Sequence, residues 1–261
     1  MNYHATPQRD RERLARQLDR LLTRYRPGRA EELEALLATG AAAPTLIVTF
    51  DDGLADHLEV AAPLLEERGL TGIFAVPADF PSVPAGEQPA WYREHAVDPA
   101  LGLAWGEDDL RGLDWDGVRE LARRGHRVAV HTASHVRLTA DTPREILERE
   151  IVEARARVDE EIGAAADGFC WPWGRDPSAA GADALVRATY RYALVGEAGI
   201  LRAGADPHVV ARTNLEAHWP DEIVDLQLSR LADLRSTLRR LGRSYGAAGS
   251  AGRLRPSSSD R

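Results

Sequence analysis

The sequence has no lysine and only one cysteine. All 33 of its basic residues are therefore arginine. This absence excludes a P-loop lysine, the strand lysine of a kinase and Schiff-base catalysis, because each of these needs a lysine amine. With Cys170 alone, no disulfide can form within the chain, which is typical of proteins from a reducing compartment.

Long apolar runs and an excess of positive charge are also missing. No stretch approaches the roughly 18 apolar residues that a membrane-spanning helix needs, so we expect no integral membrane segment. The first residues are polar and lack the apolar middle of a secretory signal, which predicts a cytoplasmic protein. The net charge of −8 argues against a nucleic-acid partner, since binding phosphates needs a basic surface.

What the sequence does contain is an alternation of strand-like and helix-like segments. Hydrophobic residues make up 44% of the chain, enough for a sizeable core. Strand-like segments lie at 45–50, 72–78, 127–133, 168–173, 192–196 and 208–217, and helix-like segments at 62–69, 115–125, 142–163, 179–188 and 220–241. This alternation indicates an α/β fold with a parallel sheet or barrel.

The chain divides into three parts. Residues 1–43 carry leucines between charged residues and predict an N-terminal helical extension, broken near Pro27 and Gly28. Residues 44–241 hold the alternating pattern and form the expected domain. Residues 242–261 are rich in glycine, serine and arginine and are expected to be a disordered tail.

The segment 142–163 gives the clearest helix signal. Thr142 and Glu145 have the spacing of a capping box, with Pro143 at the first helical position, and Gly163 ends the helix.

A long insertion at 79–113 interrupts the alternation and carries several aromatic residues. Long ordered loops often act as lids over a site, and local packing is the equally weighted alternative.

Two adjacent carboxylates end the first strand-like run of the domain, in "LIVTFDDG" at 46–53. Asp51 and Asp52 follow the apolar residues directly. The carboxyl end of a parallel strand is where α/β folds place their ligand sites. Because a buried carboxylate is costly when unpaired, this position favours a metal ion or strong hydrogen bonds at the pair.

Two histidines follow another strand-like run, in "HTASH" at 131–135. His131 and His135 are four residues apart. Two imidazoles and one carboxylate are a common catalytic zinc set that leaves one coordination position open. A third strand-like run ends in "FCWPWG" at 169–174, where Trp171, Pro172 and Trp173 either pack in the core or wall a sugar-sized pocket.

The order of these motifs, TFDDG, HTASH and then an aromatic-Pro-aromatic-Gly strand end, resembles the polysaccharide deacetylase family, the NodB-homology group of carbohydrate esterases. The resemblance covers about 44–241. It implies a distorted (β/α) barrel with a divalent metal ion at its mouth. His126, in the approach to HTASH, is then expected to be structural.

The resemblance also implies roles for single residues. Asp52, His131 and His135 would bind the metal, and Asp51 would be the base that takes a proton from the attacking water. Thr132 stands where the family commonly braces the metal loop with a hydroxyl. The implied metal is zinc first, with cobalt, nickel, manganese or iron as alternatives.

The third motif departs from the pattern of many family members. They have an arginine, which holds the catalytic aspartate, where this chain has Cys170. Arg212 resembles an arginine on a late strand in a related subgroup and is expected to take over its role, with Arg175 as the weaker substitute.

The histidines outside HTASH are assigned from the same comparison. The family's general acid is a histidine in a late Leu-x-His motif, and here "LEAH" is one residue longer and makes His218 the candidate. His57, His95 and His208 are taken as surface or loop residues.

The sequence therefore predicts a metal-dependent hydrolase that removes an N-acetyl group from an amino sugar or sugar conjugate. Two alternatives stay open. One is a hydrolase of a non-sugar or cyclic amide on the same scaffold. The other is a catalytically degenerate glycan-binding protein, which the loss of the motif arginine at Cys170 favours.

Overall fold

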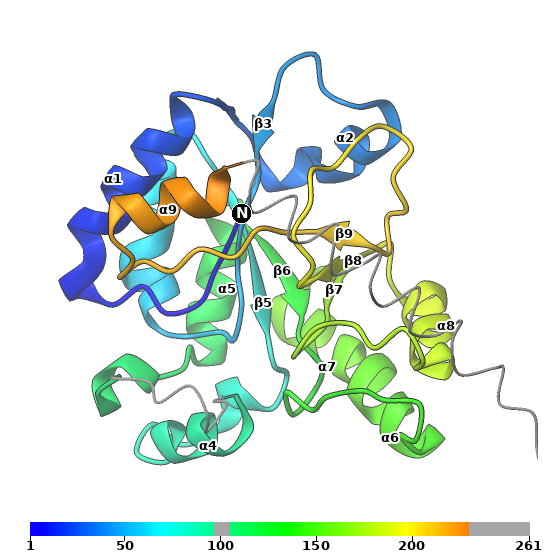
Figure 1. The fold of residues 1–261 in the computed structure, drawn as a ribbon. Coiled ribbons are helices and arrows are strands. Elements are labelled where there is room, and N and C mark those ends of the chain that lie inside the picture. Colours follow the sequence, from blue (N-terminus) through cyan, green and yellow to red (C-terminus); the bar gives the residue numbers. More distant parts are fainter. Residues whose placement is uncertain (97–104, 230–261) are drawn as a thin grey trace, which may run out of the picture.

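The computed structural model describes residues 1–96 and 105–229 of the chain. Its centre is a seven-stranded sheet in the order β1-β4-β5-β6-β7-β8-β9, in which every neighbouring pair is parallel (Figure 1). The strands are β1 Asn2–Tyr3, β4 Val48–Phe50, β5 Gly72–Val76, β6 Arg127–Val130, β7 Gly168–Cys170, β8 Tyr192–Val195 and β9 Val210–Ala211. β2 (Arg26–Pro27) and β3 (Thr45–Leu46) form a separate two-stranded sheet.

A single β-bridge between Asn2 and Asn214 joins the two ends of the curled sheet. The backbone of Asn2 in β1 donates to the Thr213 carbonyl and accepts from the Leu215 amide, at 2.9 and 2.8 Å. These bonds join β1 to the segment that follows β9. The expected distorted (β/α) barrel is confirmed.

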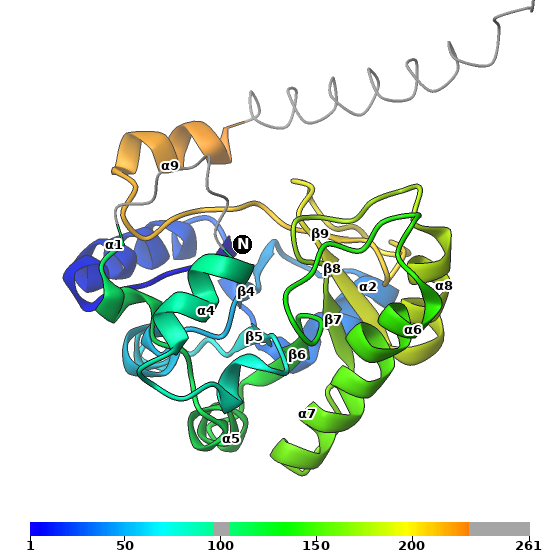
Figure 2. The same cartoon turned by 90° about the horizontal axis from the view of Figure 1, so that it is seen from below.

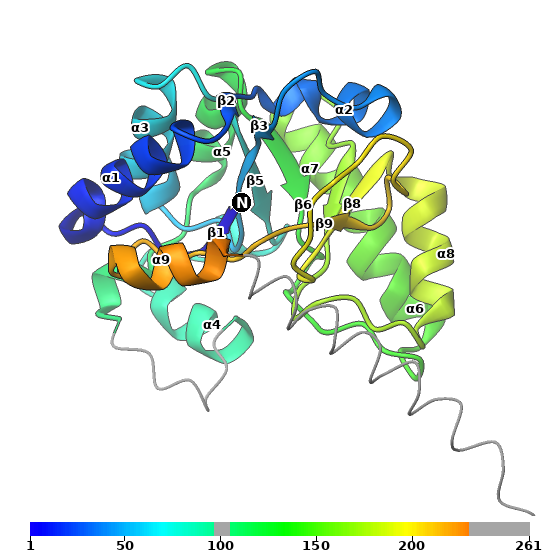
Figure 3. The ribbon, with the colours of Figure 1, turned by 45° about the horizontal axis from the view of Figure 1, so that its top comes forward.

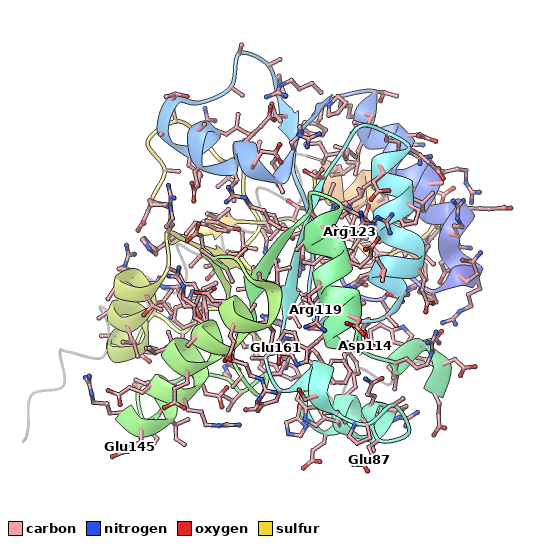
Figure 4. All side chains as sticks on the ribbon, turned by 180° about the vertical axis from the view of Figure 1, so that it is seen from behind. Glu87, Asp114, Arg119, Arg123, Glu145 and Glu161 are labelled. Carbon is pink, nitrogen blue, oxygen red and sulfur yellow. The ribbon has the colours of Figure 1, made fainter. Side chains whose placement is uncertain are left out.

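Helices surround the sheet. They are α1 Arg11–Leu22, α2 Leu33–Thr39, α3 Ala62–Glu66, α4 Gln88–His95, α5 Trp115–Arg123, α6 Arg144–Leu147, α7 Ala154–Ile162, α8 Ala180–Thr189 and α9 Asp221–Leu228. α5 and α7 lie side by side on the rear face, joined by an ion pair between Arg119 and Glu161 (Figure 4). α1 and α9 adjoin on another side, where Arg20 pairs with Asp225 (Figure 3).

Side chains alternate along the strands between two apolar clusters. In β5, Phe74 and Val76 pack beneath the helices, while Ile73 and Ala75 belong to a smaller cluster that also holds Cys170. This alternation is the two-residue period of a strand buried on both faces.

The first residues of the chain are part of the barrel. We expected 1–43 to be a helical extension, and α1 and α2 are indeed helices on either side of β2. However, β1 lies in the central sheet with Asn2 opposite Thr49 and Tyr3 opposite Phe50. The segment expected to precede the domain therefore supplies one of its strands.

The strand expected at 45–50 is two strands in different sheets. Thr45–Leu46 pairs with β2, whereas Val48–Phe50 enters the barrel. The apolar run alone carries no signal for this division, because it depends on which neighbour each half meets.

The helix expected at 142–163 forms, with a π-helical turn at Glu148–Glu153 between α6 and α7. Gly163 ends it in the left-handed region, at φ 67°. The expected capping box is wrong. Pro143 is the N-cap residue, and the Thr142 hydroxyl accepts from the Thr139 amide instead.

No helix within residues 1–96 and 105–229 is long and apolar enough to cross a membrane. The expected cytoplasmic location stays a prediction. The expected tail at 242–261 and the second half of the helix at 220–241 lie outside the described residues.

Gly168 in β7 tests how closely the barrel is packed. A Cβ atom there would overlap the ring of Tyr192 on β8. We expect Gly168→Ala to lower the free energy of unfolding by about 1–3 kcal/mol, because neither strand can move away without breaking the sheet. Urea unfolding measures this. Gly86→Ala is the control, since nothing lies within 4 Å of its Cβ position, and an equal loss in both variants would contradict the account.

Candidate metal centre and active site

The site lies where several strands of the barrel end. Asp51 and Asp52 directly follow β4, and His131 directly follows β6. Alternation along β4 places Thr49 and Asp51 on the face opposite Val48 and Phe50. Arg212, after β9, reaches the same face. The carboxyl ends of parallel strands meet at one edge of a sheet, and this brings residues far apart in the sequence together.

Three buried side chains have the arrangement of a metal-binding set. Oδ1 of Asp52 lies 3.4 Å from Nε2 of His131 and 3.2 Å from Nε2 of His135. Tetrahedral ligands that are each about 2.1 Å from a zinc ion stand about 3.4 Å apart. The donor set therefore fits a zinc-sized cation.

The second nitrogen of each imidazole is fixed by a backbone carbonyl. Nδ1 of His131 donates to the Cys170 carbonyl, and Nδ1 of His135 donates to the His95 carbonyl, both at 2.8 Å. These bonds set the tautomer that leaves each Nε2 free to bind a metal, as second-layer contacts commonly do. Thr132, expected to brace this loop, donates its hydroxyl to the His131 carbonyl at 2.6 Å.

Backbone strain is concentrated at the same place. Among the residues that the structure describes, four non-glycine residues have positive φ, namely Asp52, Thr132, His135 and Trp173, at 82°, 60°, 59° and 59°. A residue other than glycine at positive φ has a higher free energy than the same residue at negative φ. The surrounding contacts therefore hold the loop in a conformation that the sequence alone disfavours.

Asp51 is held by a different partner from Asp52. Nη1 and Nη2 of Arg212 donate to its two carboxylate oxygens at 2.7 and 2.9 Å, and Asn2 donates to Oδ2 at 3.0 Å. Burial alone raises the pKa of the Asp51 carboxyl, but Arg212 and the nearby His131 and His4 hold that pKa well below its usual range. Asp51 is therefore ionised at neutral pH.

Cys170 explains how Arg212 reaches Asp51. Its sulfur lies 3.2 Å from Nη2 of Arg212, and its thiol donates to Asp51 at 3.4 Å. The small side chain leaves room for the guanidinium from β9. The other proposed substitute, Arg175, pairs with Asp183 instead.

A second group of potential ligands shares His131. Asp51, His131 and Cys170 also lie close enough together to hold a cation. A cation there would face the guanidinium of Arg212, and both Asp51 oxygens are already engaged. Repulsion between like charges in a buried site therefore favours the set with Asp52 and His135.

His4 lies at the site although no sequence motif marks it. Its Nε2 is 4.0 Å from Oδ2 of Asp51, and its Nδ1 is 3.0 Å from Oε1 of Glu216. Burial favours the neutral ring, but the charges of Glu216, Asp52 and Asp51 raise the pKa of His4 to about 10. His4 is therefore protonated at neutral pH.

The motif that suggested His218 contributes a different residue. His218 is exposed, and its backbone carbonyl accepts from Arg13. Glu216, two residues earlier in "LEAH", reaches the site and contacts His4. The structure does not bring His218 to Asp51.

Two of the remaining histidines are not where we expected them. His57, taken as a surface or loop residue, is fully buried, and its Nε2 donates to the His4 carbonyl at 3.0 Å. His95 lies in α4. His126, expected to be structural, accepts from the Gly72 amide.

The three aromatic-motif residues have different environments. Trp171 is buried in the core against Phe169, and Pro172 is also buried. Trp173 is 41% exposed and sits edge-on to the His135 ring, with Nε1 donating to the His135 carbonyl at 3.1 Å. Of the three, only Trp173 presents its ring beside the ligand set.

The sequence matches a family of known enzymes. The family described as polysaccharide deacetylase matches residues 39–193, which is more than half of the chain. The chain belongs to this family. Such enzymes hydrolyse the amide bond of N-acetyl groups on sugars, so the prediction of an N-deacetylase is confirmed at that level. No curated protein matches the chain.

Solved structures with the same fold include deacetylases. IcaB from Ammonifex degensii has a TM-score of 0.66 and 22% identity, covering 87% of this chain and 94% of that one. The Streptococcus pyogenes deacetylase PplD has a TM-score of 0.63 and 17% identity, covering 88% and 96%. A de-N-acetylase from Aggregatibacter actinomycetemcomitans has a TM-score of 0.62 and 15% identity, covering 87% and 98%. At these identities the likeness concerns the fold.

The ion pair between Arg212 and Asp51 yields a stability prediction. Arg212→Ala leaves a buried carboxylate without its counter-charge, so we expect a loss of about 3–5 kcal/mol in the free energy of unfolding. In an Asp51→Asn background the same change should cost less, by about 0.5–3 kcal/mol. Urea unfolding of the two single variants and the double variant measures this. Additive losses would show that the two side chains do not interact.

Proposed function

We propose that the protein removes the N-acetyl group of an amino sugar or sugar conjugate, using a divalent metal ion held by Asp52, His131 and His135. The observation that carries this proposal is the division of work between two adjacent carboxylates. Asp52 faces two imidazoles whose other nitrogens are fixed. Asp51 faces an arginine and stays ionised beside them.

The three proposed ligands restrict which metal ion the site would bind. Two imidazoles and one carboxylate suit zinc best, with cobalt, nickel, manganese and iron as the alternatives. A bound divalent ion supplies Lewis-acid chemistry here, lowering the pKa of water and polarising an amide carbonyl.

Asp51 is the general base. Arg212 and Asn2 fix its carboxylate in one orientation, next in sequence to the ligand Asp52. A base must lie within reach of the proton it removes and must be unprotonated at the working pH. Asp51 takes the proton of the attacking water as the oxygen bonds to the acetyl carbon.

His4 is the general acid, in the role expected of His218. It carries a proton at neutral pH, and Glu216 fixes its ring on the side away from Asp51. When the carbon–nitrogen bond breaks, the leaving amine needs a proton, and Nε2 of His4 donates it. The products are acetate and the free amino group.

The substrate class is tested by product analysis. Trp173 offers a half-exposed aromatic face beside His135, suited to the apolar face of a sugar ring. A substrate panel separates the proposal from the non-sugar alternative. N-acetylated sugars are scored for acetate release, and cyclic amides are scored for ring opening.

The alternative of a degenerate glycan-binding protein rested on Cys170 in place of the motif arginine. Arg212 supplies the positive charge that was missing there.

The two aspartates should respond differently to the same change. We expect Asp51→Asn to abolish turnover of the N-acetyl substrate while retaining about one equivalent of metal, because only the base is lost. Asp52→Asn should lose the metal as well. Elemental analysis of both purified variants, beside acetate release, measures this. Equal metal loss in the two variants would contradict the division of roles.

His4 and His218 form a matched pair of variants. We expect His4→Gln to lower kcat by about 10²–10⁴-fold with the metal retained, and His218→Gln to leave kcat unchanged. Burial lowers the pKa of His4, but the nearby charge of Glu216 raises that pKa above its usual value, so wild-type kcat should decline at alkaline pH as His4 loses its proton. His4→Gln should lack this alkaline decline. A large loss in His218→Gln alone would restore the role to that residue.

A further inference from the structure

The helix α4, within the insertion that interrupts the strand–helix pattern, contacts the ligand residues. It lies at the bottom of Figure 1 and toward the viewer in Figure 2, where the barrel is seen from below. The Tyr92 hydroxyl donates to Oδ2 of Asp52 at 2.5 Å, and the two residues are 1% and 4% exposed. Since Oδ1 of Asp52 faces the two imidazoles, Tyr92 occupies one carboxylate oxygen and directs the other toward them.

The same helix fixes a second ligand residue. The carbonyl of His95, at the last position of α4, accepts the Nδ1 proton of His135 at 2.8 Å. His135 has φ 59°, so its loop is strained and depends on outside contacts to keep its conformation. Two ligands that follow different strands, β4 and β6, are thus braced by residues one helical turn apart.

The attachment of α4 is largely separate from the barrel core. The ring of Trp91 stacks on the rings of Phe80 and His95, with centroids 4.5 and 4.3 Å apart. The cluster that holds the helix is distinct from the two barrel clusters, and its buried members are Ala5, Leu54, Phe80, Tyr92 and Leu110. A small cluster of this kind can open on its own at a lower free energy than the whole fold.

We infer that α4 is a positioning element for the metal centre: Tyr92 and the His95 carbonyl hold Asp52 and His135 in ligand geometry, so metal binding and the docking of α4 stabilise each other. The inference rests on the proposed function, because it takes Asp52, His131 and His135 as the ligands. Coupling of this kind is reciprocal, since whatever α4 adds to metal affinity, the metal adds to the docking of α4.

Tyr92→Phe removes the hydroxyl and keeps the ring. We expect the Kd for Zn²⁺ to rise by roughly 10- to 100-fold, as is usual when a hydrogen bond to a metal-binding side chain is lost. Competition with a chelator, on the full chain, measures this Kd. Tyr190→Phe is the matched control. Its hydroxyl donates to the Ile151 carbonyl at 2.6 Å, also buried, and neither residue belongs to the ligand set. This control should lose stability and keep its Zn²⁺ affinity.

Hydrogen exchange tests the reciprocal effect. The amides of Trp91 and Ala96 donate to the Glu87 and Tyr92 carbonyls, at the start and the end of α4. Their exchange should slow by roughly 5- to 150-fold on adding Zn²⁺ to the wild type, and by much less in Tyr92→Phe. This readout needs no substrate and no turnover.

The outcomes separate the inference from the proposed function. If the wild type binds Zn²⁺ through Asp52 and Tyr92→Phe binds it within twofold of the wild type, the inference is wrong and the proposed function stands. The inference is also wrong, and the proposed function also stands, if Zn²⁺ binds but does not slow amide exchange in α4. If the wild type binds none of Zn²⁺, Co²⁺, Ni²⁺, Mn²⁺ and Fe²⁺, both are overturned.

Discussion

The buried ion pair between Asp51 and Arg212 is the interaction on which the site depends. Two neighbouring carboxylates repel each other, and in the proposed mechanism one of them must remain ionised beside a cation without binding it. Arg212 achieves this by engaging both oxygens of Asp51. Asp52 is then left to face the two histidines. The pair also fills the place of the arginine that the third motif lacks, because Cys170 is small enough to let Arg212 pass.

The ion pair in turn depends on closure of the barrel. Arg212 follows β9 at one end of the sheet, and Asn2, which contacts both Asp51 and Arg212, lies in β1 at the other. The backbone bonds of Asn2 to Thr213 and Leu215 hold these ends together. Because His4 stands two residues after Asn2 in the sequence, this closure also brings His4 to the site. In this account, the first residues of the chain are therefore part of the active site.

The residues that could be predicted from the sequence are those that follow long apolar runs. Asp51, Asp52, His131 and His135 each stand in a motif at or just beyond a strand, so their place together at one edge of the sheet could be predicted. Their separate roles came from the resemblance to the deacetylase family and stay predictions. His4 follows a strand of only two residues, which leaves no periodic signal, and its partner Glu216 is far away in the sequence. Trp171 and Trp173 differ in burial through local backbone conformation, which residue type does not encode. Tyr92 lay in an insertion whose contacts only the fold determines.

Anomalous diffraction from crystals of the wild-type protein grown with zinc tests the central claim most directly, because it locates the ion and both aspartates at once. The account predicts one zinc peak at about 2.0–2.2 Å from Oδ1 of Asp52 and from Nε2 of His131 and His135. Asp51 would remain on Arg212, outside the coordination sphere. A peak bound by Asp51, His131 and Cys170, or no peak at the barrel mouth, would contradict it.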